Sequence, residues 1–441
     1  MFALAWPVIV AELGWMGMGT VDTIMAGRLG REALGAVSTG NILYDVVAIA
    51  GIGLLLGLDT LVSQSWGAGD IGDCHHSVRQ AIYMAIAMTP LIMLGGAGFV
   101  PLMRAAGVMP EVEAGAAAYI YAVNWGTLPL LIYAALRRYL QGMGLVRPVM
   151  FALVSANIVN AFGNWVLMFG NLGAPALGVA GSAWATVIAR IWMAATLIVY
   201  AVTREHSDFF RGSWAFDLAR CRRLLALGMP AAGQIVLEIG VFAAAGVLAG
   251  RLSALAVAAH QMALNTIAVT FMVPLGISSA GAVRVGHAIG RGDSDGVRRA
   301  GSAALVLAVS FMVLAAFSFF AIPRQILSVY TADAALIDTG MILLYIAAVF
   351  QMFDGVQVVA TGLLRGVGDT RTPMLTNFVG HWLLGLPASW LLCYRASLGV
   401  YGIWAGLSIG LMVVATVLFV IWRRRSRYIV GAAARFVREC V

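Results

Sequence analysis

The chain has 441 residues, of which 61% are hydrophobic and only 11% are charged. A water-soluble core cannot bury so much apolar surface, so a soluble globular protein is excluded and the bilayer must be the solvent. The net charge of +8 is carried by arginines. They serve membrane topology and contact with anionic lipid, so the positive charge requires no nucleic-acid partner.

A helix that crosses a bilayer needs about 20 mostly apolar residues. In chain order, charged or Gly/Pro-rich breaks separate twelve such stretches, at residues 2–27, 36–63, 77–103, 112–142, 148–170, 177–203, 224–250, 256–283, 297–322, 335–364, 373–394 and 399–422. The stretches are continuous, whereas an outer-membrane barrel shows short alternating segments. The predicted fold class is therefore an all-α membrane protein with twelve transmembrane helices.

The distribution of arginines predicts the orientation of these helices. Most arginines lie in every second loop and in the C-terminal tail, and Arg190 lies inside a predicted span. The opposite loops hold only Arg28, Arg31, Arg104, Arg251, Arg324 and Arg395. Since basic residues favour the cytoplasmic side, both termini are predicted to be cytoplasmic, in a multi-pass protein of a bacterial inner (plasma) membrane.

The two halves of the sequence are similar to each other. Residues 27–70 align without a gap on residues 250–293 at a constant offset of 223, and 11 of the 44 positions are identical. Six spans per half is an even number, so both halves enter from the same side and form a parallel repeat. We therefore predict four parts: an N-lobe at 1–203, a cytoplasmic linker at 204–223, a C-lobe at 224–425 and a cytoplasmic tail at 426–441.

Shorter motifs repeat as well. LQGMG (140–144) corresponds to LRGVG (364–368), and LGVAG (177–181) corresponds to LGVYG (398–402). A basic run precedes Pro230, and nothing comparable precedes its counterpart Pro7. We therefore expect a longer reading frame to supply a short basic leader.

Ionisable residues inside the predicted spans are few and mostly acidic, and such residues usually have a function. Glu238 and Asp354 are each the single carboxylate of a long apolar run. A carboxylate cannot stay ionised alone in a low dielectric; it must bind a proton, a metal cation or a cationic ligand, or pair with another group. We interpret these two residues as the cation-coupling site; the alternative is a fixed structural hydrogen bond.

Asp22 is the corresponding candidate in the first half. Asn160 and Asn164, one helical turn apart in the fifth span, lie on one face and could hydrogen-bond a carboxylate or a cation. Their alternative role is to join neighbouring helices by hydrogen bonds. We predict a substrate or proton site at Asp22, Asn160 and Asn164.

The other ionisable residues inside the spans remain open. Asp45 could face a cleft or pair with Arg190, and Glu12 could lie in a cleft or at an interface. For Asp59, near the end of its span, we expect a capping or loop-ordering role. His260 and His381 are expected to be hydrogen-bonded within the helix bundle.

Other motifs argue against enzyme chemistry. The four cysteines are dispersed singly, without a CxxC pair or a His-rich run, so neither a disulfide framework nor a metal cofactor is predicted. The sequence contains no GxxxxGK[ST] motif, and no HExxH, GxSxG or paired Asp motif stands at a suitable position. We predict no enzyme activity and no cofactor, with the energy supplied by an ion gradient.

Four segments carry a resemblance to a known family. They are PVIVAELGWMGMGTVDTIMAG (7–27), LEIGVFAAAGVLAGRLSALAVAAHQMALN (237–265), VPLGISSAGAVRVGHAIGRGD (273–293) and FDGVQVVATGLLRGVGDTRTP (353–373). The sequence resembles the multidrug and toxic compound extrusion (MATE) family, especially its NorM-type branch. The resemblance implies a two-lobed, monomeric, secondary active antiporter that exports cationic or amphipathic organic compounds in exchange for Na⁺ or H⁺ by alternating access.

The resemblance also assigns roles to residues. The family's cation-site carboxylates, which are Na⁺ ligands where the ion is Na⁺, correspond to Glu238 and Asp354, and the N-lobe acid corresponds to Asp22. At position 164 this chain has Asn where some relatives have Asp, and Phe350 stands where some Na⁺-coupled relatives have an aromatic hydroxyl. The coupling ion is therefore left open between Na⁺ and H⁺.

One alternative function shares the two-lobed plan, namely a lipid-linked oligosaccharide flippase. The cavity of such a protein should be rich in arginine, because it must accept a diphosphate. The intramembrane charges of this chain are mainly carboxylates, which favours a transporter of cations.

Overall fold

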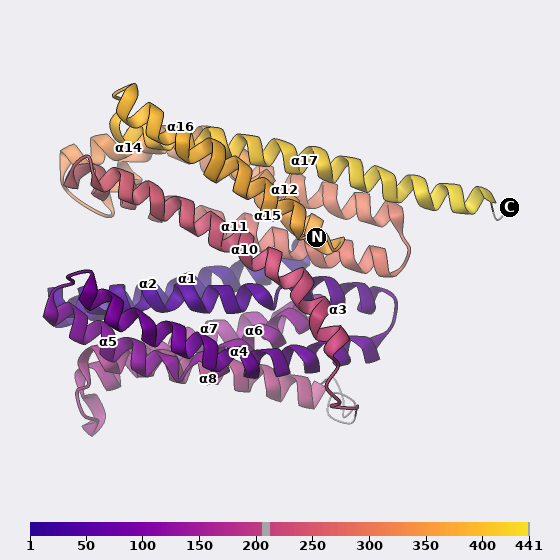
Figure 1. The fold of residues 1–441 in the computed structure, drawn as a ribbon, viewed down its shortest axis with the longest axis horizontal. Coiled ribbons are helices and arrows are strands. Elements are labelled where there is room, and N and C mark those ends of the chain that lie inside the picture. Colours follow the sequence, from indigo (N-terminus) through magenta and orange to yellow (C-terminus); the bar gives the residue numbers. More distant parts are fainter. Residues whose placement is uncertain (205–211, 440–441) are drawn as a thin grey trace. The chain divides into compact units, whose positions relative to one another are not determined.

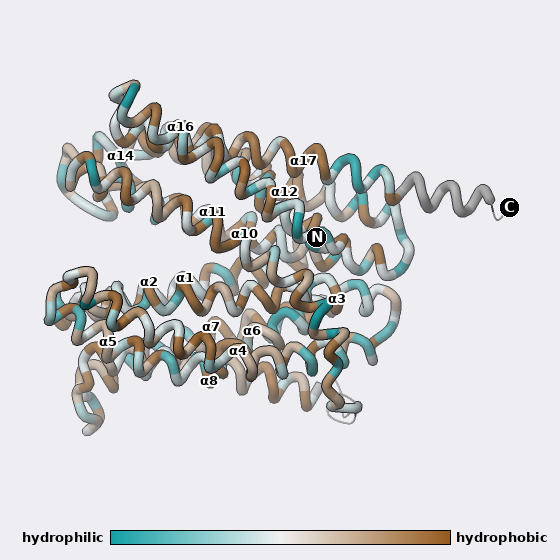
Figure 2. The backbone as a smooth tube through the Cα atoms, viewed as in Figure 1, coloured by the Kyte–Doolittle hydropathy of each residue, from teal (hydrophilic) through white to brown (hydrophobic). Residues whose placement is uncertain are grey.

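In the computed structural model the described residues are 1–204 and 212–439, and their regular structure is helical throughout (Figure 1). The long helices are hydrophobic over most of their length, and hydrophilic residues gather toward some of their ends (Figure 2). This confirms the predicted all-α membrane fold class. The seven residues 205–211 of the predicted linker lie outside the described residues.

Each half of the chain supplies one set of helices. The first half forms α1 (Phe2–Leu29), α2 (Arg31–Leu54), α3 (Gly57–Gly67), α4 (Ile71–Ala105), α5 (Pro110–Asn124), α6 (Thr127–Gly142), α7 (Val146–Phe169), the 3₁₀ turn η1 (Asn171–Gly173) and α8 (Gly178–Arg204). The second half forms α10 (Leu218–Gly250), α11 (Ala254–Gly290), α12 (Ser294–Ala321), α13 (Pro323–Ser328), α14 (Ala334–Gly366), α15 (Arg371–Asn377), η2 (Phe378–Gly385), α16 (Leu386–Trp390), η3 (Leu391–Arg395) and α17 (Gly399–Glu439).

All twelve predicted spans correspond to helical stretches of the described chain. Ten are helices long and apolar enough to cross a membrane, with α2 and α3 together forming one of them. An eleventh is the pair α5 and α6, which is bent by 53° at a short break. The twelfth, at 373–394, is built from α15, η2, α16 and η3, where two π-helical segments flank Pro387. Proline lacks a backbone N–H, so one helical hydrogen bond is missing at Pro387.

Two helices extend beyond the predicted lobes, into the predicted linker and the predicted tail. α10 begins at Leu218, inside the predicted linker, and α17 continues through the predicted tail to Glu439. Arginines mark the edge of an apolar run but do not end a helix, because arginine is a good helix former. Hydropathy therefore located the spans and underestimated the length of these two helices.

The described chain forms two compact units. The N unit contains Val10–Trp66 and Asp70–Ala232, and the C unit contains Met1–Ile9, Gly67–Gly69 and Gly233–Val441. The first turns of α1 thus belong to the C unit, and the first turns of α10 belong to the N unit. The core of the N unit packs around Tyr133 and Tyr139, and that of the C unit around Phe319 and Trp404.

Matching glycines allow two helices to approach closely in each unit. In the N unit, a Cβ on Gly53 of α2 would lie 2.7 Å from the Cα of Ala232 in α10. In the C unit, a Cβ on Gly276 of α11 would lie 2.8 Å from the backbone nitrogen of Ile9 in α1. Small residues are common at such membrane helix contacts. Both partners keep the offset of 223 found in the sequence, so the duplication is also visible in the packing.

The repeated Gly-Asp pair forms the same turn in both halves. Gly69 and Gly292 have φ angles of 80° and 69°, a conformation that glycine adopts readily. The following Asp70 accepts a hydrogen bond from the backbone of Asp73 at the start of α4 (2.9 Å). Asp293 does the same at the start of α12 (2.7 Å). Aspartate is a preferred N-cap, which explains why these two positions are identical in the repeats.

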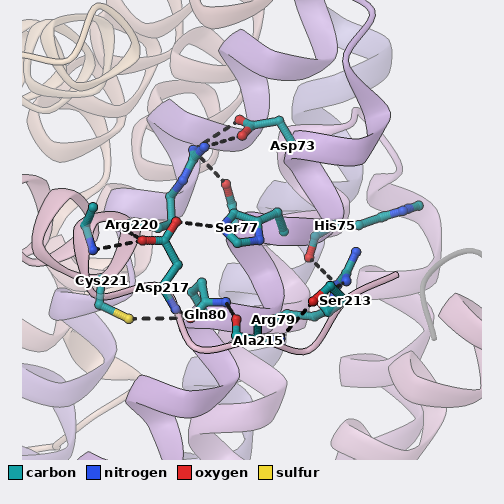
Figure 3. Close-up of polar contacts among 12 residues, drawn as sticks. Asp73, His75, Ser77, Arg79, Gln80, Ser213, Ala215, Asp217, Arg220 and Cys221 are labelled. Atoms are coloured by element: carbon teal, nitrogen blue, oxygen red, sulfur yellow. Dashed lines mark hydrogen bonds and ion pairs between the residues drawn. The ribbon is translucent and has the colours of Figure 1, made fainter. Parts of the chain in front are cut away.

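The segment just before α10 is attached to α4 within the N unit (Figure 3). Gln80 of α4 donates a hydrogen bond to the carbonyl of Ala215 (2.8 Å) and accepts one from the backbone N–H of Asp217 (3.0 Å). Arg220, in the first turn of α10, forms an ion pair with Asp73, in the first turn of α4. The end of the predicted linker is therefore held to α4 by several polar contacts.

Asp217 caps the start of α10, and its protonation should control this cap. The backbone N–H of Arg220, together with His76 and the N–H of Ala219, stabilises the charged carboxylate and lowers its pKa below the usual 3.8. The stabilisation is present above the unfolded pKa and is lost as the pH falls through the folded pKa. In Asp217→Ala we expect the amides of Ala219 and Arg220 to exchange hydrogen roughly several-fold faster at pH 7.

Hydrogen–deuterium exchange, corrected for the intrinsic rate at each pH, measures this effect. The wild-type protein should approach the exchange of the Asp217→Ala variant only in strong acid. Loss of protection in the wild-type protein at pH 5 to 6 would show that another group controls the cap.

Candidate functional site

Glu238 and Asp354 lie near each other in the C unit, on α10 and α14. Asp354 is buried, with 7% of its surface exposed, and Glu238 is partly buried. Asp354 is close enough to Glu238 for the two carboxylates to repel each other. The structure thus brings together two acids that are 116 positions apart in the chain.

Amide side chains surround these two carboxylates. Gln234, one turn before Glu238 on α10, donates a hydrogen bond to it (2.6 Å). Gln357, one turn after Asp354 on α14, also interacts with Glu238 and donates to Asn377 (3.2 Å). The groups that interact with either carboxylate in the described chain include no basic side chain. The two acids and the amides beside Glu238 therefore form one polar cluster without a basic side chain.

The oxygen atoms of this cluster are suited to binding a small hard cation or a proton. Oε1 of Gln357 is buried and has no hydrogen-bond partner among the described atoms. Carboxylate and amide oxygens are the ligands that hard cations prefer. No group of three or more His, Cys, Asp or Glu in the described chain could hold a metal ion. A bound Na⁺ would therefore need amide oxygens such as that of Gln357 in addition to the two carboxylates.

Asp22, Asn160 and Asn164 form a second buried cluster, in the N unit. Nδ2 of Asn164 on α7 donates a hydrogen bond to Asp22 on α1 (2.6 Å) and also lies 3.2 Å from Oδ1 of Asn160. Both asparagines are fully buried, and Asp22 is 5% exposed. The structure therefore brings the three predicted residues together as one hydrogen-bonded group.

The sequence analysis did not identify three neutral side chains of these clusters: Thr186, Gln234 and Gln357. Thr186 of α8 donates a hydrogen bond to the second oxygen of Asp22 (3.0 Å). Gln234 and Gln357 could have been predicted from the sequence, because each lies one helical turn from a predicted acid. Thr186 gave no such signal, since it contacts an acid on another helix.

Glu12 and Asp59 are paired with arginines inside the N unit. Glu12 of α1 forms an ion pair with Arg137 of α6. Arg138 lies 3.5 Å from Asp59 in the first turn of α3. Both acids and Arg137 are less than 10% exposed. Glu12, which the sequence left between a cleft and an interface, thus joins α1 to α6.

The two intramembrane histidines are buried in the C unit. Trp404 donates a hydrogen bond to Nδ1 of His260 (3.1 Å), and the two rings meet edge to face at 5.8 Å. His381 lies in the π-helical segment η2, and neither of its ring nitrogens has a hydrogen-bond partner among the described atoms. Phe350 packs against Trp404, with ring centroids 6.1 Å apart. The expectation of hydrogen-bonded histidines therefore fits His260 and fails for His381.

Comparison with known proteins identifies the chain's relatives. The MatE family model matches residues 7–166 and 230–391, one stretch in each half. A probable multidrug resistance protein NorM from Mesorhizobium japonicum is 37% identical over 436 residues, covering 96% of this chain and 93% of the relative. The multidrug resistance protein NorM of Aliivibrio fischeri is 32% identical over 434 residues, covering 96% and 94%.

Solved structures have the same fold at lower sequence identity. The crystal structure of a eukaryotic MATE transporter is 20% identical with a TM-score of 0.87, covering 98% of this chain and 97% of that chain. An outward-facing multidrug resistance MATE transporter of the MOP superfamily is 18% identical with a TM-score of 0.86, covering 97% and 95%. The family model matches both repeats and the relatives extend over nearly the whole chain, so this protein belongs to the MATE family of membrane transporters, which are not enzymes.

Proposed function

We propose that this chain is a secondary active multidrug efflux antiporter, which exports cationic or amphipathic organic compounds in exchange for Na⁺ or H⁺ by alternating access. One observation carries the proposal: the partly buried Glu238 and the buried Asp354 lie close together, and no basic side chain of the described chain interacts with either of them. Two buried carboxylates without a basic partner require a cation from outside the protein. The names of the NorM relatives support the class of substrate.

The exchange follows from competition for the same negative charge. In the outward-open state an external cation occupies Glu238 and Asp354, and its charge weakens the hold of the site on a cationic substrate, which leaves. In the inward-open state the ion departs and the carboxylates attract the next substrate. An inside-negative membrane potential favours ion entry by about 2.3 kcal/mol per charge per 100 mV.

The cluster of Asp22, Asn160 and Asn164 is proposed as a substrate or proton site of the first lobe. Asn164 and Thr186 donate hydrogen bonds to both oxygens of Asp22 and so orient its carboxylate. An arriving proton or organic cation would meet an oriented carboxylate. We expect Asp22→Asn to slow efflux less than substitution of Glu238 or Asp354, or to slow it only for some substrates.

The proposed topology and organisation follow the sequence. Both termini are cytoplasmic, residues 1–203 and 224–425 act as the two lobes of a monomer, and residues 204–223 and 426–441 are a cytoplasmic linker and tail. The membrane is the inner membrane of a bacterium. The asymmetric distribution of arginines between alternate loops supports this orientation.

Efflux from proteoliposomes tests the proposal. Vesicles containing the purified protein are loaded with ethidium, and an inward gradient of Na⁺ or of H⁺ is imposed separately. We expect one of the two gradients to accelerate ethidium efflux over vesicles without a gradient. If neither gradient accelerates efflux while a labelled lipid-linked oligosaccharide diphosphate is moved across the bilayer, the antiporter proposal is wrong and the flippase alternative is correct.

A further inference from the structure

Two further charged side chains, Arg190 and Asp45, lie beside the Asp22 cluster in the N unit. Arg190 is on α8, one helical turn after Thr186, which donates a hydrogen bond to Asp22. Asp45 is on α2 and accepts a hydrogen bond from Asn41 (3.2 Å). Arg190 lies beside both acids, because its guanidinium contacts the ring of Tyr44, the residue before Asp45, and Thr186, one turn before it on α8, is hydrogen-bonded to Asp22. Three charged side chains from three helices therefore belong to one group.

Arg190 is held in a buried position specific to this side chain. Its guanidinium lies 4.7 Å from the centroid of the Tyr44 ring, a cation–π contact. A Cβ on Gly126, at the break between α5 and α6, would lie 3.1 Å from Cδ of Arg190, so the break makes room for the arginine. Arg190 is 4% exposed, and its Nη1 has no hydrogen-bond partner among the described atoms. A buried guanidinium with an unused donor is not explained by packing alone.

The other buried acids of the N unit already have ionic partners. Glu12 is paired with Arg137, and Asp59 lies 3.5 Å from Arg138. Each pair has no net charge. The formal charge of the remaining group is therefore set by Asp22, Asp45 and Arg190 alone. Two carboxylates and one guanidinium sum to a single negative charge when all three are ionised.

We propose that Arg190 is the resident counter-cation of Asp22 and Asp45, and that it limits this group to one exchangeable monovalent cation. Arginine keeps its proton in proteins, so its charge is permanent. A buried group with one net negative charge is neutralised by one proton or by one cationic centre of a substrate. This inference rests on the proposed antiport function and adds Arg190 and Asp45 as positioning residues, which set the charge that Asp22 presents.

The two units differ in the net charge that their clusters of acids can carry. No basic side chain interacts with Glu238 or Asp354 in the C unit, so that pair carries up to two negative charges. The N-unit group carries one. Two monovalent cations can neutralise the pair in the C unit, whereas one monovalent cation neutralises the N-unit group. The two clusters of one transporter are thus suited to different cation counts.

A set of charge-changing variants tests the inference in the ethidium efflux assay. Asp45→Asn leaves no net charge in the group, and Arg190→Gln leaves two negative charges. The double variant Asp45→Asn/Arg190→Gln restores one. We expect each single variant to slow efflux by about threefold, a milder loss than at Glu238 or Asp354, and the double variant to recover to nearly the wild-type rate, because a charge sum is additive whereas lost packing is not recovered by a second change.

The comparison of the double variant with Asp45→Asn is decisive even if Arg190→Gln cannot be purified. A purely structural role for Arg190 predicts that the double variant is slower and less thermally stable than Asp45→Asn, and either result would overturn the inference. Absence of gradient-driven efflux by the wild-type protein would instead refute the proposed function, and this inference with it. Normal wild-type efflux without recovery in the double variant refutes this inference alone.

Discussion

Asp354→Asn is expected to slow ion-driven ethidium efflux by about tenfold or more while leaving the protein folded. The substitution removes the charge of a side chain that is 7% exposed and keeps its shape. Asn cannot exchange a proton and offers only one weak oxygen ligand to Na⁺. Glu238→Gln should have the same effect, because the two carboxylates lie together and the proposed coupling requires both. Efflux from proteoliposomes under the gradient that drives the wild-type protein measures the loss.

A matched control lies on the same helix. Asp338 of α14 forms an exposed ion pair with Arg324 (3.1 Å), and both side chains are 64% exposed. Asp338→Asn makes the same chemical change where water screens the charge, and exposed pairs contribute only about 0–1 kcal/mol. We expect normal efflux from this variant. A normal rate in Asp354→Asn would show that the pair with Glu238 is not the coupling site.

Most of the fold could be predicted from the sequence, because the bilayer imposes a simple rule on it. A spanning helix must be long and apolar, so hydropathy located all twelve stretches. The internal repeat was visible as identical residues, some of which have a local structural role: Asp70 and Asp293 cap the N-termini of α4 and α12. The break between α5 and α6 was not predicted. Its local signal, Gly126 followed by Pro129 in the first turn of α6, was overlooked because the apolar run continues through it.

The candidate site was only partly predictable, for a different reason. Isolated acids such as Glu238 and Asp354 are visible in a sequence because burial of a charge is costly. Their partners are neutral and lie on other helices, so Thr186 could not be found without the fold. Arg137 was misinterpreted: it counted among the arginines of the alternate loops and the tail that predict a cytoplasmic side, although position 137 lies in the predicted span 112–142. It lies in α6, 6% exposed and paired with Glu12.

Among the ion pairs of the N unit, the pair of Glu12 and Arg137 should contribute most to stability. Glu12→Gln leaves a buried guanidinium that cannot lose its proton, and breaking such a pair typically costs about 3–5 kcal/mol. Arg137→Met leaves a carboxyl group, which can take up a proton and so lose its charge. We therefore expect both variants to unfold more readily than the wild-type protein, and Glu12→Gln to be the less stable of the two.

Denaturant titration in detergent micelles measures these differences in the free energy of unfolding. Glu113→Gln is the matched control, because Glu113 pairs with Arg104 in the same unit (2.8 Å) but the arginine is 77% exposed. Water solvates the charge that remains, so the control should lose only about 0–1 kcal/mol. In the double variant Glu12→Gln/Arg137→Met neither charge of this pair remains, and stability should recover most of the loss. A double variant less stable than Glu12→Gln would mean that the pair acts through its packing and not through its charge.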